Sequence, residues 1–398
     1  MKRFPKAGGN NCQLRSGRLA VLASPRDENP YQELLYGELR RRGVRVTYDD
    51  GPTRSRTLNV ALMPFMLAWH RALGCQILHL HWVFQFNLPW AKQAPWARWL
   101  LEKWFYLYLR TAHLLGYAIV WTAHDITPHA PVFYKDARAH VQLARESDVV
   151  IALSQATAAE VASWRARAVR VVPFGAYALP ELSEAARQEA RRTLGWRHDE
   201  TVVVHLGKLL PYKGADLLLQ VAAGLPGHIR VVVAGACPDE AYAGLLARLA
   251  RSGASRAELR LGRLNDEEMG LLLLGADVAA FPFREVTNSS SLLLASCYGL
   301  PVVAPGLPQL DDLPAGHVLR YDGSVAGLRE ALVGFSQLSE HQRQQMSSDA
   351  RSWARSMDWG TVASLTLEAY GEAVRQRCST SWRANRAQPP ERPLRRSN

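Results

Sequence analysis

The sequence has no apolar run that could cross a membrane and no pattern of a secretory leader. The basic N-terminus continues into Gly8-Gly9-Asn10-Asn11 instead of an apolar segment. A spanning helix needs roughly 18 apolar residues in a row, and no stretch reaches that length. The five cysteines are scattered, without the spacing of a metal site or of a disulfide framework. We therefore expect a cytoplasmic protein, soluble or peripheral to a membrane.

The formal charge of +12 is concentrated at the two ends of the chain. Residues 1–18 carry +5 and residues 379–398 carry +4, which leaves +3 for the long middle part. A nucleic-acid-binding domain carries its basic residues on the folded part. We therefore expect basic, disordered tails over residues 1–17 and 377–398 and no nucleic-acid partner.

The first half alternates apolar runs with helical segments, which is typical of an α/β protein with a doubly wound parallel sheet. Asn29-Pro30 predicts the start of a helix, with Asn29 as its cap. The G-x-G-x-x-G turn of dinucleotide-binding proteins is missing after the first strand. Apolar runs predict strands at residues 18–23, 44–47, 76–82, 117–122, 148–152 and 168–172.

The length of 398 residues favours two domains over one compact core. The Pro- and Gly-rich segment 173–180 is the predicted linker. We place the first domain at residues 18–178 and the second at residues 179–376. The second domain ends in helices from about residue 325, and we expect the last helix to return to the first domain.

Two predicted strands of the first half end in side chains that are suited to ligand binding or proton transfer. One ends in His81-Trp82, and the other leads into His124-Asp125 and His129. Ligands of open α/β sheets bind outside the carboxyl ends of the strands, which favours a functional role. An adjacent imidazole and carboxylate suit proton transfer or the binding of sugar hydroxyls. The alternatives are a core histidine beside a packing tryptophan, and an aspartate that only caps the next segment.

Residues 85–115 combine aromatic and basic side chains with a single acid, Glu102. Such a mixture suits a membrane interface, where rings lie at headgroup depth and cations meet anionic lipids. The alternative is a long helix that packs its aromatic side chains inward. We favour the membrane because the aromatic residues fall on too many turns for one stripe. The set comprises Trp90, Trp96, Trp99, Trp104, Phe105, Tyr106 and Tyr108 with Lys92, Arg98, Lys103 and Arg110.

The second half is organised around the stretch from Phe281 to Pro305, which predicts a strand end, a polar loop, a helix and a strand. Residues 287–291, Thr-Asn-Ser-Ser-Ser, favour a helix N-terminus ahead of the apolar residues 292–295. Free N–H groups and the helix dipole make such a terminus an anion site, most often for phosphate. The alternative is that the serines only cap the helix.

A buried strand at residues 201–207 leads into a loop with two lysines, Lys208 and Lys213. Two positive charges beside backbone N–H donors match the needs of a diphosphate. The alternative is a pair of solvated surface lysines. Further strands are predicted at residues 228–234 and 258–263, and the latter ends in Arg263.

These motifs resemble the GT-B glycosyltransferases of the family 4 superfamily, over about residues 18–376. The strongest parts are Gly207-Lys208 with Lys213-Gly214, residues 276–282, and Ala295 with residues 299–303. The resemblance implies two Rossmann-like domains facing a cleft, a nucleoside-diphosphate sugar as donor substrate, no cofactor and no metal. By this resemblance, Lys208 and Lys213 bind the diphosphate of the donor. We assign to the donor site Gly207, Lys208, Lys213, Arg263, Asn288, Ser289, Ser290 and Ser291.

The N-terminal motifs are similar to those of a branch of bacterial exopolysaccharide enzymes that includes β-mannosyl- and glucosyltransferases. These motifs are residues 29–31, His81-Trp82, and residues 121–125 with His129. The resemblance implies a peripheral enzyme at the inner membrane that transfers a hexose to a lipid-linked saccharide or a polysaccharide. His81, Trp82 and His129 are then acceptor-side residues.

One departure from family 4 bears on the mechanism. The family usually has two glutamates separated by seven residues where this chain has Val286 and Leu294, and Glu285 is one residue out of register. This absence favours an inverting transfer, with Asp125 as general base and His124 holding the donor sugar, over a retaining one in which the donor phosphate takes the proton. A catalytically inactive GT-B-like nucleotide-binding protein is the alternative.

Overall fold

The computed structural model describes residues 19–27, 29–92, 94–126, 131–252 and 257–385. The chain divides into two compact units. The first ends its main part at Leu153 and also takes Thr157–Val172 and the chain from Ala363 onward. The second comprises Ser154–Ala156 and Pro173–Val362. The division falls at Pro173, whereas the sequence analysis placed the boundary at residue 178, and the segment from Ala363 is grouped with unit 1.

Unit 1 is built on a parallel sheet whose described strands follow the order β2-β1-β3-β4-β5-β6. Each strand overlaps a predicted one, and four of the strands are buried over their whole length because helices cover both faces of the sheet. The bounds are β1 Ala20–Ser24, β2 Arg45–Tyr48, β3 Ile77–Leu80, β4 Ala118–Ala123, β5 Val149–Ala152 and β6 Val169–Val171.

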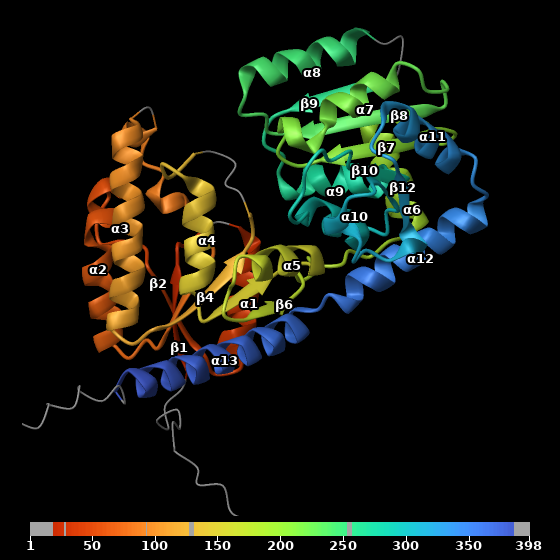
Figure 1. The fold of residues 1–398 in the computed structure, drawn as a ribbon. Helices are drawn as coiled ribbons and strands as arrows, with labels where there is room; N and C mark the ends of the chain where they lie inside the picture. The colour runs from red at the N-terminus through yellow and green to blue at the C-terminus, as the bar shows by residue number, and fades with distance from the viewer. Residues whose placement is uncertain (1–18, 28, 93, 127–130, 253–256, 386–398) are drawn as a thin grey trace, which may run out of the picture. The chain divides into compact units, whose positions relative to one another are not determined.

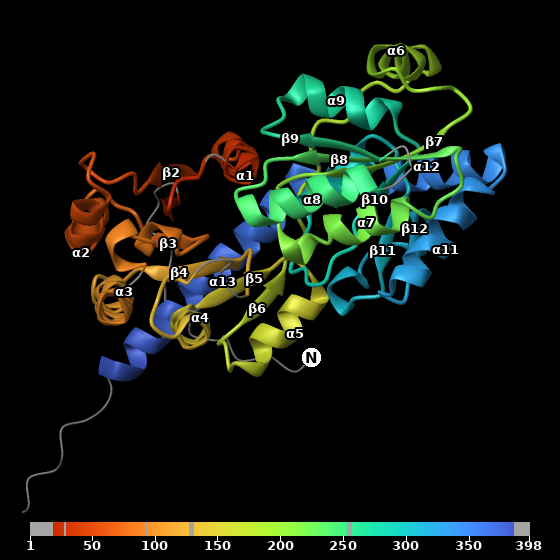
Figure 2. The same ribbon diagram turned by 90° about the horizontal axis from the view of Figure 1, so that it is seen from above.

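Helices lie on both faces of this sheet, with α1 and α13 on one side and α2, α3 and α4 on the other (Figure 2). Asn29 caps α1 as predicted, since its Oδ1 accepts a hydrogen bond from the Tyr31 N–H at 3.0 Å. The sequence analysis passed over α2, an apolar helix with Pro64 in its interior. The bounds are α1 Pro30–Arg41, α2 Arg56–Ala72, η1 Phe84–Phe86, η2 Pro89–Ala91, α3 Pro95–Leu114, α4 Asp136–Glu146, α5 Gln155–Ser163 and α13 Trp359–Asn385.

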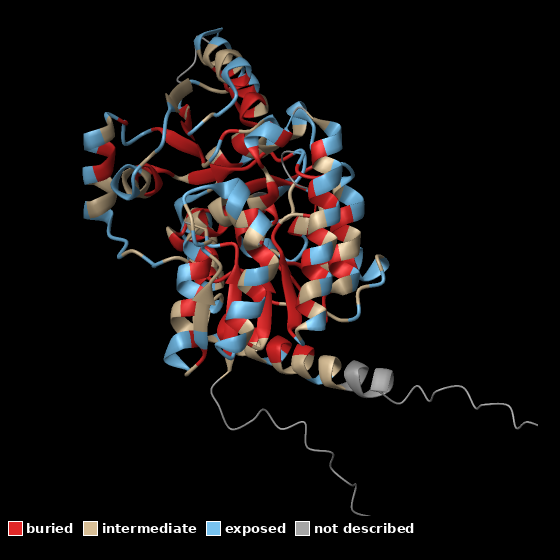
Figure 3. Ribbon diagram, turned by 90° about the vertical axis from the view of Figure 1, so that its left-hand side faces the viewer, coloured by how far each residue is buried: buried red, intermediate tan, exposed pale blue. Residues whose placement is uncertain are grey.

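Unit 2 contains a second parallel sheet, in which the described strands follow the order β12-β11-β10-β7-β8-β9. One apolar cluster packs under α9 and α10, and another under α7, α8 and α11. Strands β7, β10 and β11 are buried over their whole length. Figure 3 shows buried strands among helices that have exposed sides. The strands are β7 Thr201–Leu206, β8 Ile229–Gly235, β9 Ala257–Leu261, β10 Val278–Ala280, β11 Val302–Pro305 and β12 Val318–Tyr321.

The helices of unit 2 include two that the sequence analysis did not predict, α6 and α8 (Figure 1). The bounds are α6 Glu184–Leu194, η3 Pro211–Lys213, α7 Ala215–Ala222, α8 Glu240–Ser252, α9 Asp266–Gly275, α10 Ser290–Cys297, η4 Pro308–Leu310, η5 Ala315–His317, α11 Val325–Ser336 and α12 Glu340–Ser356. In the described part of the chain, no helix combines the length and the apolar character that a membrane crossing requires.

The predicted disordered C-terminal tail begins too early. Helix α13 continues through residue 377, where we placed the start of the tail, and ends at Asn385. Its described portion packs on unit 1, with Thr366 and Tyr370 fully buried. A helix that is already formed adds residues at little cost, and the next proline is Pro389. The composition of the segment alone therefore misplaced the helix end.

Candidate functional site

The predicted donor loops of unit 2 meet where the strand order of its sheet reverses. β7 pairs with β8 on one side and with β10 on the other, and the chain winds away from β7 in both directions. In open α/β sheets, ligands bind at this switch point, outside the carboxyl ends of the strands. The loop that follows β7 and the loop that follows β10 both lie there, so the topology brings together two segments about 80 residues apart in the sequence.

Three of the predicted donor residues come together at this point. A Cβ placed on Gly207 would lie 2.7 Å from Ser291 Oγ and 3.6 Å from Lys213 Nζ. Gly207 also has a φ of +125°, a conformation that side chains disfavour. Glycine therefore allows the Ser291 hydroxyl at the N-terminus of α10 and the Lys213 ammonium to lie close to the backbone at Gly207. We call these three residues, Gly207, Lys213 and Ser291, the anion cluster.

The other predicted donor residues lie at the same edge of the sheet but in different surroundings. Ser289 is the N-cap of α10, with its Oγ accepting from the Leu292 N–H at 3.2 Å. Ser290 lies beside Tyr177. Lys208, Asn288 and Arg263 are exposed, and Arg263 follows β9, the edge strand. The capping alternative therefore holds for Ser289 and not for Ser291.

An ion-pair network that we did not predict holds the lysine loop in place. Arg284 donates to both carboxylate oxygens of Asp216, at 2.9 and 2.6 Å, and also to the Pro211 carbonyl. The Tyr242 hydroxyl donates to Asp216 at 2.7 Å. Burial opposes ionisation of Asp216, but these bonds hold its pKa below the ordinary value. A signal was present, since Arg284 directly follows a predicted strand end.

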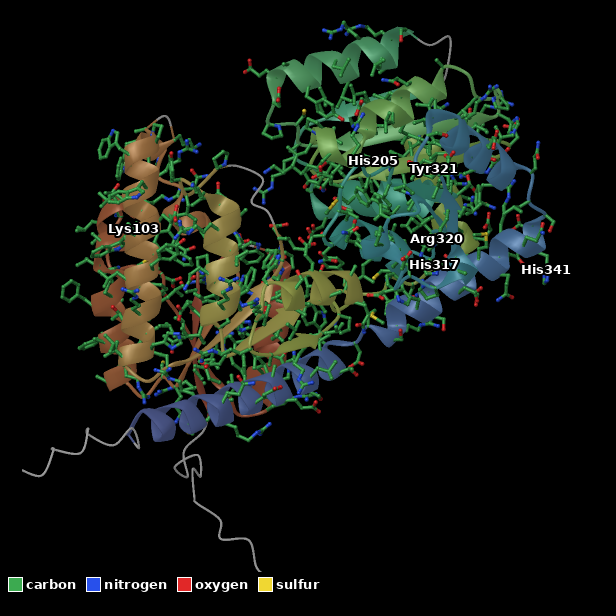
Figure 4. The ribbon with its side chains drawn as sticks, viewed as in Figure 1. Lys103, His205, His317, Arg320, Tyr321 and His341 are labelled. Atoms are coloured by element: carbon green, nitrogen blue, oxygen red, sulfur yellow. The ribbon has the colours of Figure 1, made fainter. Side chains whose placement is uncertain are left out.

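His205 lies in β7, two residues before Gly207 (Figure 4). Its Nδ1 lies 2.8 Å from the Ala280 carbonyl oxygen of the neighbouring strand β10. Burial lowers the pKa of His205 to about 4, and the nearby Lys213 acts in the same direction. A neutral His205 therefore adds no second charge to the anion cluster at pH 7.

Val286 and Leu294, at the positions of the family's two glutamates, are partly buried against the apolar cluster under α9 and α10. Their side chains therefore serve packing. Glu285 is exposed.

In unit 1, the predicted histidines are brought into direct contact. His81 follows β3 and His124 follows β4, and the two strands pair in parallel. Nδ1 of His81 lies 3.0 Å from Nε2 of His124. The Trp82 ring stacks on His124 with centroids 4.2 Å apart, and Tyr31 meets His124 edge-on at 4.7 Å. Asp125 is half-buried next to this group, and His129 lies outside the described residues.

Hydrogen bonds that we did not predict hold His81 from its other side. The Tyr36 hydroxyl lies 2.5 Å from His81 Nε2 and 3.0 Å from His79 Nδ1. His79 contacts Tyr370 of α13 at 2.7 Å and Thr122 at 2.8 Å. Both nitrogens of His81 are thus occupied, and Nδ1 of His124 is the nitrogen left for a ligand.

The three histidines are neutral at pH 7. Burial lowers the pKa of His124 to about 4, although Asp125 opposes the shift. Burial lowers the pKa of His79 to about 3, and it lowers that of His81 as well, with help from the other two rings. Neutral imidazoles can donate and accept hydrogen bonds, which suits the binding of sugar hydroxyls.

Unit 2 also has a cavity of about 300 Å³ that includes Asp277 and Pro301. Both residues immediately precede strands, so this cavity lies at the amino edge of the sheet, away from the anion cluster. Within the described residues, no three His, Cys, Asp or Glu side chains group as metal ligands would.

Parts of the chain are similar to known proteins. Residues 186–308 match the family model of the glycosyl transferases group 1. The D-inositol 3-phosphate glycosyltransferase of Mycobacterium avium (strain 104) is 30% identical over 206 residues, covering 48% of this chain and 46% of the relative. The protein of the same name from Mycobacterium marinum is 27% identical over 327 residues, covering 77% and 66%.

Solved structures show the same fold. HepE of Anabaena, solved with UDP and glucose, has a TM-score of 0.68 at 17% identity, covering 89% of this chain and all of that one. Sucrose-phosphate synthase of Thermosynechococcus elongatus has a TM-score of 0.68 at 16% identity, covering 91% of this chain and 100% of its own.

These likenesses and the two parallel sheets confirm the predicted GT-B fold. The family model and the relatives agree with the predicted class over the part of the chain that they match, since residues 186–308 are similar to the glycosyl transferases group 1. The matches span less than half the length of two of the curated relatives, 46% and 44%. The reaction of this chain, its substrates and its partners are therefore the subject of the proposal that follows.

Proposed function

We propose that this protein transfers a hexose from a nucleoside-diphosphate sugar to a lipid-linked saccharide or polysaccharide in exopolysaccharide assembly. The observation that carries the proposal is the anion cluster at the switch point of unit 2. Lys213 supplies a charge, and Ser291 and the N-terminus of α10 supply hydrogen-bond donors close to the backbone at Gly207. Charge-assisted bonds of this kind stabilise the diphosphate and the leaving nucleotide. HepE, of the same fold, was solved with UDP and with UDP-glucose.

Unit 1 supplies the groups for the proton transfer in this proposal. Asp125 accepts the proton of the attacking hydroxyl, and Nδ1 of His124 binds a sugar hydroxyl. The stacked Trp82 and the hydrogen bond from His81 hold the His124 ring in one orientation. An inverting transfer needs such a protein base, whereas the donor phosphate serves in a retaining one.

The names of the relatives bring a second acceptor chemistry, a phosphorylated polyol. Both acceptors present hydroxyl groups to unit 1, and only the saccharide acceptor brings a lipid. A second candidate function is nucleotide binding without transfer. Val286 and Leu294 favour it, because both pack on the core where family members have hydrogen-bonding glutamates.

The proposal predicts that a nucleotide sugar raises the melting temperature of the full chain. A ligand bound only by the folded state stabilises it by about 2.7 kcal/mol at a hundredfold excess over Kd. Thermal unfolding with UDP-glucose, UDP-galactose, GDP-mannose, UDP and GDP measures this effect, with AMP as control. No shift with any of the sugars and diphosphates at millimolar concentration would overturn the donor assignment.

The exposed face of α2 and α3 supports peripheral membrane binding. The two helices lie side by side (Figure 1). Phe65 and Trp69 of α2 are 70% and 61% exposed, and Trp96 and Trp99 of α3 are 68% and 50% exposed. Lys103 lies 5.6 Å from the Trp99 ring centre (Figure 4). Exposed rings on neighbouring helices, with a cation beside one of them, suit an anionic lipid surface.

Some aromatic residues of segment 85–115 are buried in the core and others are exposed, as a membrane contact would require. Phe105 and Tyr108 are buried in the core, and Trp104 donates to the Val60 carbonyl at 2.8 Å. Among the described aromatic side chains of this segment, Trp90 of η2 and Trp96 and Trp99 of α3 are exposed, and α2 adds the exposed Phe65 and Trp69.

We expect replacement of Phe65, Trp69, Trp96 and Trp99 by serine to lower vesicle binding at least about tenfold, since each buried ring contributes roughly 1.5–3 kcal/mol. Flotation with vesicles containing phosphatidylglycerol measures the bound fraction, which should also fall with salt. Tyr134→Ser, at a ring that is 51% exposed and outside this face, is the control. If the variant with all four substitutions binds vesicles as well as the wild-type chain does, the basic tails are the membrane anchor.

A further inference from the structure

Unit 1 contains a cavity of about 420 Å³ that the functional assignment does not use. It opens at the carboxyl ends of β1 and β2, between Ser24 and Asp49, and one wall comes from α2 through Val60 and Met63. Its volume falls in the range of about 300–1,000 Å³ that small-molecule sites occupy. It lies at the same edge of the sheet as His81 and His124, because all strands of this sheet are parallel.

Two hydrogen-bond acceptors in this cavity lack partners. Oε1 of Gln85 is buried and has no hydrogen-bond partner among the described residues. In the same part of the chain, no donor or cation reaches the Asp49 carboxyl group, which lines the cavity. Burial and the neighbouring Asp50 raise the pKa of Asp49 to about 6, so the carboxyl group is ionised at neutral pH. Hydrogen-bond acceptors without partners favour a ligand that donates hydrogen bonds.

The remaining walls add two cations and an apolar surface. Tyr108, which is fully buried and near Ser24 and Asp49, is not among the lining residues, and burial raises its pKa. Arg26, which pairs with Asp50 at 3.2 Å, and Arg56 lie at the rim. The apolar side chains from α2 suit the C–H groups of a ring. Hydroxyl groups on a compact ring would satisfy this set of contacts.

We infer that this cavity is an acceptor subsite that binds the hydroxyl groups of a sugar or cyclitol ring, with Asp49 and Gln85 as its hydrogen-bond acceptors. The inference rests on the glycosyl transfer proposed above. The strand order indicates which part of the acceptor this cavity would bind. β2 and β4 are three strand spacings apart in the sheet, about 14 Å at roughly 4.8 Å each. The cavity thus takes a part of the acceptor beyond the hydroxyl that faces Asp125.

Binding of small rings to the full chain tests this subsite without any transfer reaction. The probes are methyl β-D-glucopyranoside, cellobiose, myo-inositol and myo-inositol 1-phosphate, followed by saturation-transfer NMR in the absence of donor. We expect binding that Asp49→Asn and Gln85→Ala each weaken at least about tenfold, the loss expected when a buried hydrogen bond is left unmade. Asp199→Asn, the same chemical change on an exposed carboxylate of unit 2, should leave it unchanged.

The UDP and GDP thermal shifts of the same variants separate two kinds of failure. A wild-type chain that binds neither nucleotide contradicts the proposed function. A chain that binds nucleotide but none of the rings, or binds them equally after both substitutions, contradicts the subsite alone. If Asp49→Asn does not fold, Gln85→Ala decides. Preference for the phosphorylated ring, lost in Arg56→Gln, would identify a phosphate contact at the rim.

Discussion

Replacing Lys213 by alanine is expected to lower the affinity for UDP or GDP by about ten- to a hundredfold. Lys213 Nζ lies near Gly207 and the Ser291 hydroxyl, at the carboxyl edge of the sheet, so it is placed to pair with a diphosphate oxygen. A hydrogen bond to a charged group contributes roughly 1.5–3 kcal/mol, and each 1.4 kcal/mol is a factor of ten. Isothermal titration with UDP and GDP measures the loss. Lys208→Ala combined with Lys213→Ala should lose more, since two charges then leave the loop.

Two further variants show whether the lysine acts through the anion cluster. Gly207→Ala should also abolish nucleotide binding, because its Cβ would lie 2.7 Å from Ser291 Oγ and the φ of +125° disfavours a side chain. Lys135→Ala removes a lysine from unit 1 and should have no effect. Nucleotide affinity that stays at the wild-type value in the double lysine variant would remove the observation on which the proposed function rests.

Asp125→Asn is expected to reduce turnover at least about a hundredfold while nucleotide binding stays unchanged, because a general base contributes roughly a hundred- to ten-thousandfold. The asparagine keeps the size of the side chain but cannot take up the proton. Turnover is measured as sugar transferred from labelled donor to a membrane extract, and NMR of the product gives its anomeric configuration. Asp199→Asn is again the matched control.

The possible outcomes distinguish three mechanisms. Inverted product together with a large loss in Asp125→Asn supports Asp125 as the base. Product with the donor's configuration, or near-full activity in the variant, shows that the donor phosphate takes the proton instead. Nucleotide binding by the wild-type chain without any transfer identifies the second candidate, a binding protein that has lost the chemistry.

The sequence predicts which residues lie at the carboxyl edge of each sheet, for a simple reason. Apolar runs bounded by Gly, Pro and polar residues predicted the strands of both sheets, and the carboxyl ends of parallel strands share one edge. Lys213 and the serines were therefore assigned to one region before any contact was known. His81 and His124 were assigned to one edge in the same way, because each ends a predicted strand.

The same pattern could not predict which side chains contact one another. Periodicity reports which face of an element is buried but not which residue it meets. It could not show that Ser291, and not Ser289, faces Lys213, or that Arg284 holds Asp216. It also missed the link from His79 to Tyr370, which lies 291 residues away in the sequence.

The sequence by itself determined the α/β class, the two sheets and the loops that carry the anion cluster, since these depend on local composition and on the geometry of parallel strands. Only the tertiary structure decided which aromatic rings of segment 85–115 are exposed, that α2 completes their face, and that Asp49 and Gln85 line one cavity. Those facts depend on how distant elements pack, because burial and unmet hydrogen bonds are properties of the assembled neighbourhood and not of any single segment.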